Sequence, residues 1–194
     1  MELVIINTKK ELAVTSLFSD YQELREKSEE NYEFINREII KMHSPSKKHQ
    51  DIVSNLHFEL RQFLKGSKCT TMLSPFDIYL EKEGIEKEIC VIPDISVMCE
   101  KSGFNEKRYC GVPTIIIEVL SSNWVDDMVR KYELYEEFGV TEYWIIDPNN
   151  EIFMIHHYDL DKKAFIRIHQ EDNVLSSYLF KDLKINKKDI FEQI

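Results

Sequence analysis

The chain has 194 residues, a formal net charge of −10, and 43% apolar residues that include eleven Phe and nine Tyr. This composition excludes a disordered chain and suffices for a core, so we expect one domain over residues 1–194, with 1–30 as an N-terminal strand and helix extension. No apolar run approaches the roughly 20 residues that cross a bilayer, and no basic stretch followed by apolar residues marks a secretory signal. We therefore expect a cytoplasmic protein with no membrane partner. The acidic charge argues against a nonspecific DNA binder, although residues 37–48 form a local basic stripe.

The four cysteines are scattered along the middle of the chain, at Cys69, Cys90, Cys99 and Cys110. No CxxC pair is present, so the spacing of a zinc site is absent. A chain of this size with an ample core does not need disulfides. The sequence therefore predicts four reduced cytosolic thiols, with Cys90 and Cys99 filling strand positions.

The first third of the chain predicts strands and helices in alternation. Residues 3–7 are a short apolar run that suits an added strand, and Ser19-Asp20 opens a helix to about Lys27. Residues 32–42 alternate around Asn36-Arg37, which predicts two strands joined by a tight turn. After the break at 44–46, apolar residues recur at helical spacing between Ile52 and Leu64, and Gly66 ends that helix.

The remainder predicts mostly strands around one long helix. The expected strands are residues 69–81, 89–99 interrupted by Pro93, 114–120, 141–147, and a hairpin of 152–158 with 164–169; the expected helices are 123–138 and a short basic one near 187–191. A strand, a helix and a strand over 114–147 form a crossover unit. We therefore expect an α/β (α+β) fold with a mixed β-sheet flanked by helices.

Two acidic residues lie inside apolar strands. Asp94 follows Pro93 in VIPDISV, and Glu118 lies within TIIIEVL. A buried acid is costly unless it is paired or binds a cation. If the two strands are neighbours, two carboxylates can point to one side and hold Mg²⁺, with water molecules completing the shell. The alternative is structural: Asp94 caps a turn, and Glu118 pairs with a cation in the core.

Longer strings in the sequence carry a family resemblance. They are PDISVMCE, GVPTIIIEVLSS, DDMVRKYELYEEFGVTEYWIIDP, FSDYQELREKSEENYEFINREIIKM and HSPSKKHQDIVSNLHFELRQFL. Together they resemble the Uma-two family of restriction-endonuclease-like proteins, a domain of unknown function in the PD-(D/E)XK nuclease superfamily. The resemblance extends from about Phe18 to Phe191. It implies a mixed sheet flanked by helices, in the manner of restriction endonucleases.

The resemblance also implies a catalytic site. Asp94 and Glu118 would be Mg²⁺ ligands, with help from the backbone carbonyl of Val119, and Mn²⁺ would substitute for Mg²⁺. Glu38, at the hairpin acid position, would approach the site through water or a second metal ion. The superfamily lysine normally lies two residues after the strand acid, where this chain has Leu120. In this family the lysine matches Lys131 on the following helix.

Other polar residues have open interpretations. Lys131 and Asp127 are four residues apart and share a helix face, which also suits an exposed ion pair. His49 lies at the start of a helix beside Lys47 and Lys48, where backbone N–H groups favour a phosphate; the alternative, which the residues alone favour, is a surface histidine beside a solvated basic turn. Asp77 is a further strand acid that either faces the site or merely starts a strand.

Two functions of different classes are compatible with these residues. The first is a metal-dependent endonuclease that hydrolyses DNA phosphodiester bonds, with Lys131 positioning the attacking water. The second is a non-catalytic module that binds nucleic acid or protein and retains the nuclease fold. Since homodimers are the commonest closed oligomers, aromatic-rich hairpins near the C-terminus are candidates for a twofold interface.

Overall fold

The protein is described here by a computed structural model, which covers residues 16–121 and 124–192, with the backbone alone described at 124–127. The predicted strand over residues 3–7 lies outside the described residues. Strands form three sheets: five strands in the order β2-β1-β5-β4-β7, six in the order β11-β10-β9-β8-β6-β3, and the pair β12-β13. Each of the two larger sheets contains both antiparallel and parallel strand pairs. The expected mixed sheet flanked by helices is therefore confirmed.

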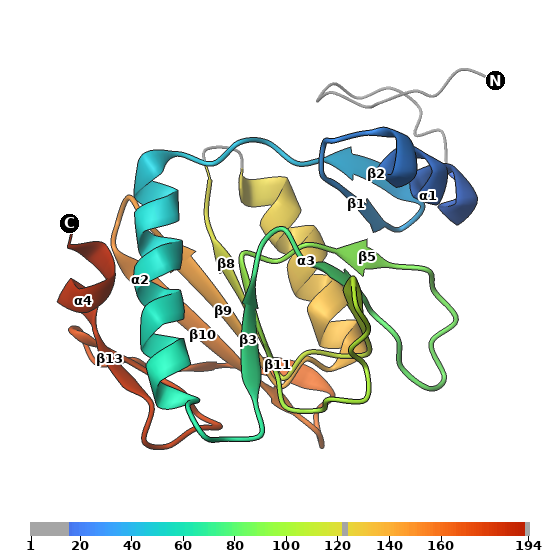
Figure 1. Ribbon diagram of the computed structural model, residues 1–194. Coiled ribbons are helices and arrows are strands. Elements are labelled where there is room, and N and C mark those ends of the chain that lie inside the picture. The colour runs from blue at the N-terminus through green and yellow to red at the C-terminus, as the bar shows by residue number, and fades with distance from the viewer. Residues whose placement is uncertain (1–15, 122–123, 193–194) are drawn as a thin grey trace.

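The five-stranded sheet and the first helix lie at one side of the molecule (Figure 1). Its elements are α1 (Phe18–Lys27), β1 (Tyr32–Ile35), β2 (Glu38–Lys41), β4 (Asp77–Tyr79), β5 (Cys90–Val91) and β7 (Arg108–Cys110). The predicted hairpin is confirmed, and Asn36 and Arg37 at its turn both have positive φ. Helix α1 begins one residue before the predicted Ser19, and the Asp20 carboxylate accepts from the Leu17 N–H at 3.1 Å.

The six-stranded sheet forms the centre. Its strands are β3 (Thr70–Leu73), β6 (Ile95–Met98), β8 (Ile115–Val119), β9 (Glu142–Asp147), β10 (Ile152–Asp159) and β11 (Ala164–Ile168). Strands β8 and β9 are parallel and are joined by α3 (Trp124–Phe138), as the crossover prediction requires. The chain ends with β12 (Val174–Ser176), β13 (Lys184–Asn186) and the short helix α4 (Lys187–Phe191), which was also predicted.

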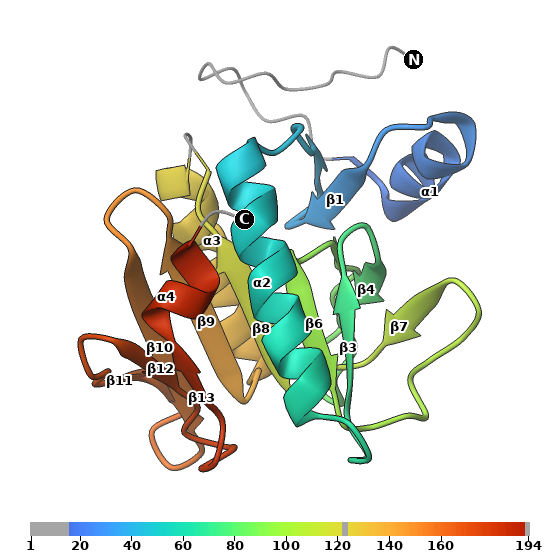
Figure 2. The same ribbon diagram turned by 60° about the vertical axis from the view of Figure 1, so that its left-hand side comes forward.

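Two long helices cover opposite faces of this sheet. Helix α2 (Lys47–Phe63) lies in front of the strands in Figure 2, and α3 lies behind them. Ile52, Leu56 and Leu60 of α2 share one core with Ile117 and Val119 of β8. Ile116 shares the other core with Leu134 and Tyr135 of α3. Because successive strand residues point to opposite faces, Glu118 lies on the α3 side.

The expected single strand over residues 69–81 is wrong. The chain leaves β3 at Ser74 and enters β4 of the other sheet at Asp77, with a cis Ser74–Pro75 bond between them. Pro75 has no N–H to donate to a ladder, so a continuous strand cannot run through it. The chain therefore passes from one sheet to the other at this proline.

None of the helices described here has the length and apolar character of a membrane-crossing segment.

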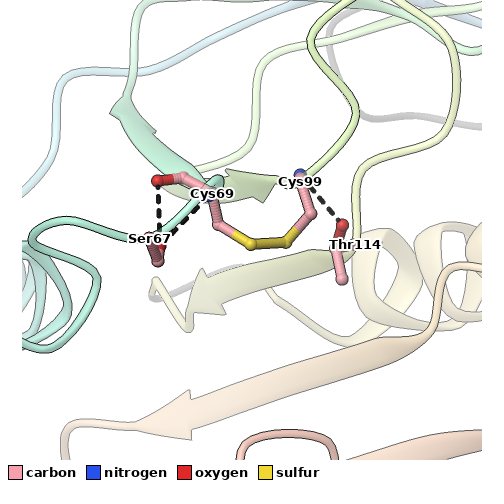
Figure 3. Close-up of a disulfide and its surroundings, with 4 residues drawn as sticks. All are labelled: Ser67, Cys69, Cys99 and Thr114. Carbon is pink, nitrogen blue, oxygen red and sulfur yellow. Dashed lines mark hydrogen bonds between the residues drawn. A yellow bond between two sulfur atoms is a disulfide. The ribbon is translucent and has the colours of Figure 1, made fainter.

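The prediction of four reduced thiols is also wrong, because Cys69 and Cys99 form a disulfide (Figure 3). Strands β3 and β6 pair antiparallel with Thr70 opposite Met98. Continuing that register brings Cys69 opposite Cys99, with their Cα atoms 3.9 Å apart. The Cys99 N–H donates to Thr114 Oγ1 at 3.2 Å, and the Cys69 N–H donates to Ser67 Oγ at 3.1 Å. Cys90 and Cys110 are free, and Cys90 is buried in a strand, as expected.

Candidate active site

The predicted site residues gather where the parallel strands β8 and β9 end. In sheets with parallel strands flanked by helices, ligands bind beyond the carboxyl ends of the strands. Glu118 and Val119 close β8, and Asp147 closes β9. The N-terminus of α2 reaches the same end of the sheet, because His49 in its first turn lies 3.1 Å from Asp94, directly before β6. Segments far apart in the sequence thus meet at one edge.

Asp94 lies directly before β6 and is held from two directions. Its Oδ2 accepts from the Val119 N–H at 2.8 Å and lies 3.1 Å from Nε2 of His49 on α2. Strands β6 and β8 are antiparallel neighbours with Ile95 opposite Ile117. Continuing the register places Asp94 beside Glu118. The strands are therefore neighbours, as the metal-site hypothesis requires.

His49 is buried within the first turn of α2. Ser46 caps this helix, and its hydroxyl accepts from the His49 N–H at 3.2 Å. Burial lowers the pKa of His49, but the hydrogen bond and charge of Asp94, with the Val119 backbone, outweigh burial, so the pKa is raised above its ordinary 6.5. His49 thus contacts a proposed metal ligand, and the exposed-histidine interpretation is wrong.

Glu118 meets the buried side of α3. Its Oε1 accepts from Lys131 Nζ at 3.1 Å and from Tyr135 Oη at 3.0 Å. Lys131 and Tyr135 are four residues apart and therefore share a helix face. Burial, followed by the charges of Glu118 and Glu33, raises the pKa of Tyr135 well above its ordinary value of 10.0, so its hydroxyl remains a donor. Lys131 is only 5% exposed, which contradicts an exposed ion pair; the side chain of Asp127 lies outside the described residues.

Sequence reasoning missed Glu33 of β1. This carboxylate is 3% exposed, its Oε1 lies 3.1 Å from Lys131 Nζ, and it accepts from the Ile92 N–H at 2.8 Å. Ile92 is two residues before Asp94, so Glu33 contacts both the lysine and the chain that carries the first acid. The signal was an acid within the apolar strand YEFI, of the same kind that singled out Glu118.

Glu38 lies on the same face of the hairpin as Glu33 but closer to the turn. The register pairs Ile35 with Glu38 and Glu33 with Ile40, and directly opposed residues share a face. Glu38 Oε2 is 3.4 Å from Arg130 Nη1, and its side chain is 39% exposed. It therefore contacts α3 one residue before Lys131, at the outer side of the cluster.

The remaining candidates lie in two places: Lys47 and Lys48 at the start of α2, and Asp77 at the start of β4. Lys47 is exposed and pairs with Asp51 at 2.6 Å, and Lys48 is half-buried near Asp147. Asp77 pairs with Arg25 of α1 at 3.0 Å, so its partner lies in the N-terminal helix. Lys47 and Lys48 thus lie in the first turn of α2, next to His49, and Asp77 forms an ion pair with the N-terminal helix.

The donor set and its charge fit a divalent cation. Glu33, Asp94 and Glu118 supply three carboxylates, and Lys131 supplies one ammonium group. Carboxylate and backbone carbonyl oxygens are the ligands that Mg²⁺ prefers, and the excess negative charge favours a cation. Within residues 16–121 and 124–192, no three His, Cys, Asp or Glu side chains are clustered closely enough to hold a metal ion as they stand. Asp94 contacts α2 and Glu118 contacts α3, and these helices cover opposite faces of the sheet. The expectation that both carboxylates point to one side is therefore not met, and a shared ion requires both to turn toward the end of the sheet.

Comparisons with known proteins identify a family and a fold. A family model, Uma2, described as "Putative restriction endonuclease", matches residues 18–186. A crystal structure of a putative nuclease belonging to DUF820, from Anabaena variabilis ATCC 29413, is similar with a TM-score of 0.67 at 20% sequence identity. The similarity covers 84% of this chain and 91% of the other, and at that identity it establishes the fold. No curated protein matches the chain.

Proposed function

Because the chain belongs to the Uma2 family of restriction-endonuclease-like proteins, we propose that it is a metal-dependent endonuclease that hydrolyses phosphodiester bonds of DNA. Asp94, Glu118 and the backbone carbonyl of Val119 would hold Mg²⁺, and Mn²⁺ would substitute for it. When bound, the ion supplies Lewis-acid polarisation of a phosphoryl oxygen and makes a coordinated water more acidic. The proposed hydrolysis would thus take place at one edge of the central sheet.

The chain's own residues would orient the reactants. Lys131, held between Glu33 and Glu118, would place its ammonium group near the attacking water and offset negative charge on the phosphate. Glu38 with Arg130 lies outside this cluster and would contact the substrate backbone through water or a second ion. Lys47 and Lys48, at the N-terminus of α2, would attract DNA phosphates to the mouth of the site.

The single observation that carries this proposal is the buried ion pair of Lys131 and Glu118 beside Asp94. Lys131 is 5% exposed and reaches two carboxylates at 3.1 Å each. Buried ion pairs contribute little to stability compared with apolar residues of the same volume, because burial removes the hydration of both charges. A cluster of this kind at the end of parallel strands is therefore better explained by chemistry than by folding.

Metal binding provides the first test, with Asp94→Asn as the variant. At a Mn²⁺ concentration about 100 times the dissociation constant, binding stabilises the folded state by about 2.7 kcal/mol, which raises Tm by roughly 5–11 °C for a chain of this size. We expect this rise in the wild type and its loss in Asp94→Asn. The control Asp159→Asn alters a turn acid that accepts from the Asp161 and Lys162 backbone N–H groups and lies 4.0 Å from Lys162 Nζ. It should respond like the wild type. Equal stabilisation of Asp94→Asn and the wild type would reject the site.

DNA cleavage provides the second test. Plasmid DNA is incubated with Mn²⁺ and either the wild type or Asp94→Asn, and nicked and linear products are measured. Cleavage by the wild type alone supports the endonuclease. DNA binding without cleavage by either protein would instead favour the non-catalytic binding module.

A further inference from the structure

Glu33 has no assigned part in the proposed chemistry, although it is as buried as the core residues around it. Its side chain is 3% exposed and lies on the face of β1 opposite to Tyr32 and Phe34, the same face as the buried Ile35. An acid in such surroundings loses its hydration and requires compensating partners. Both partners of its Oε1 are associated with the candidate site: Lys131 Nζ at 3.1 Å and the Ile92 N–H at 2.8 Å.

The contact with Ile92 fixes where the Glu33 charge lies. Ile92 follows β5 and precedes Pro93 and Asp94, so the Glu33 carboxylate is anchored to the segment that leads into the first acid. From that fixed position it contacts the same ammonium group as Glu118. Lys131 is therefore shared between carboxylates from two different sheets, with Glu33 on β1 and Glu118 on β8.

We infer that Glu33 is a positioning residue that acts through Lys131: it holds the ammonium group between the two carboxylates, so that Glu118 retains negative charge for a divalent cation. This inference rests on the proposed function. Without Glu33, Lys131 would lose one of its carboxylate partners and would compete more strongly with the cation for Glu118. Glu33 thereby sets both where the ammonium group lies and how strongly the site binds its ion.

A double-mutant cycle tests this inference, with the Mn²⁺ dissociation constant as the measurement. Glu33→Gln removes the charge but keeps an oxygen that can accept from the Ile92 N–H, and Lys131→Met removes the ammonium group while keeping an apolar stem. We expect Glu33→Gln to weaken Mn²⁺ binding about tenfold or more in the wild-type background, as is usual for residues that orient metal ligands. In the Lys131→Met background, where there is no ammonium group to position, the same change should alter binding by less than about threefold.

Three outcomes would overturn the inference. Equal weakening in both backgrounds would mean that Glu33 acts directly on the ion. Unchanged binding in both backgrounds, with a lower Tm only, would mean that Glu33 is purely structural. If Glu33→Gln alone fails to fold, the comparison is made in the Lys131→Met background, where a large further change in Mn²⁺ binding on adding Glu33→Gln would mean that Glu33 acts independently of Lys131.

A second buried acid provides the matched control. Glu142 is fully buried, accepts from Trp144 Nε1 at 2.7 Å and Ser177 Oγ at 3.1 Å, and contacts none of the candidate ligands in the described part of the chain. Glu142→Gln should lower Tm and leave the Mn²⁺ dissociation constant unchanged. Asp94→Asn separates the two proposals: if it binds Mn²⁺ like the wild type, the proposed metal site fails, whereas loss of binding in Asp94→Asn with no effect of Glu33→Gln rejects the role of Glu33 alone.

Discussion

The disulfide between Cys69 and Cys99 is expected to contribute substantially to stability. The two cysteines are 30 residues apart in the sequence, and the bond closes a loop that contains β4 and β5 and ends with β6. In the chain-entropy model, a crosslink over about 30 residues removes roughly 12 cal/mol/K from the unfolded chain. This corresponds to about 3.6 kcal/mol at 25 °C.

The perturbation is Cys99→Ser, compared with Cys110→Ser, which removes a free thiol. For a chain of this length, about 3.6 kcal/mol corresponds to a fall in Tm of roughly 7–15 °C. Thermal unfolding followed by circular dichroism measures the shift, and a dithiol reductant should lower the Tm of the wild type similarly while leaving that of Cys99→Ser unchanged. The reductant exchanges with the disulfide, gives Cys69 and Cys99 two electrons and two protons, and becomes a disulfide itself.

Thiol titration in denaturant provides an independent check. The wild type should present the two free thiols of Cys90 and Cys110 before reduction, and all four cysteines afterwards. Four reactive thiols in the unreduced protein would refute the bond. A fall in Tm below about 1 °C for Cys99→Ser would refute the loop-entropy argument while leaving the bond itself in place.

Two further predictions concern the lysine and the core histidine. Lys131→Met should reduce DNA cleavage by about 10²-fold or more with the fold retained, because the stabilisation of developing charge is lost. Cleavage kinetics with Mn²⁺ measure the reduction, and cleavage at the wild-type rate would contradict the prediction. Burial lowers the pKa of His156 from its ordinary 6.5, so the unfolded state takes up the proton first and stability falls as the pH drops below 6.5 toward the lowered folded pKa. His156→Phe should remove that part of the slope, measured as Tm between pH 7.5 and 5.5; an unchanged slope would show that other groups, such as His57, cause it.

Most helices and strands could be predicted because each is defined by a pattern of residues that are close together in the sequence. The apolar spacing from Ile52 to Leu64 is sufficient to define the buried face of α2, and the alternation about Asn36-Arg37 is sufficient to define a hairpin. Continuous apolar runs likewise identified β8 and β9 as strands covered on both faces. The family resemblance added the arrangement of these elements, which periodicity alone does not determine.

The errors concern distant pairings. Whether Cys69 and Cys99 bond depends on the register of β3 against β6, which is set only when the sheet forms. The same dependence on distant pairing explains why the sequence analysis named Glu38 and missed Glu33. Both acids lie on one face of the hairpin, and only the docking of β1 against β5 and α3 makes Glu33 the one that contacts Lys131. Glu38 and the metal ligands themselves remain predictions, to be tested by the experiments described above.

The attachment of the β1–β2 hairpin has a consequence for motion. The hairpin joins the rest of its sheet through one register pair, Phe34 with Cys90, and packs with α1 in a small aromatic cluster that also includes Cys90. Units of this kind open independently at a lower free energy than the whole molecule, which hydrogen exchange of backbone amides can detect. When this unit opens, Lys131 loses Glu33 while the central sheet stays closed. Amide exchange in Tyr32–Lys41 would therefore reveal how often solvent reaches the lysine from the side opposite Glu118.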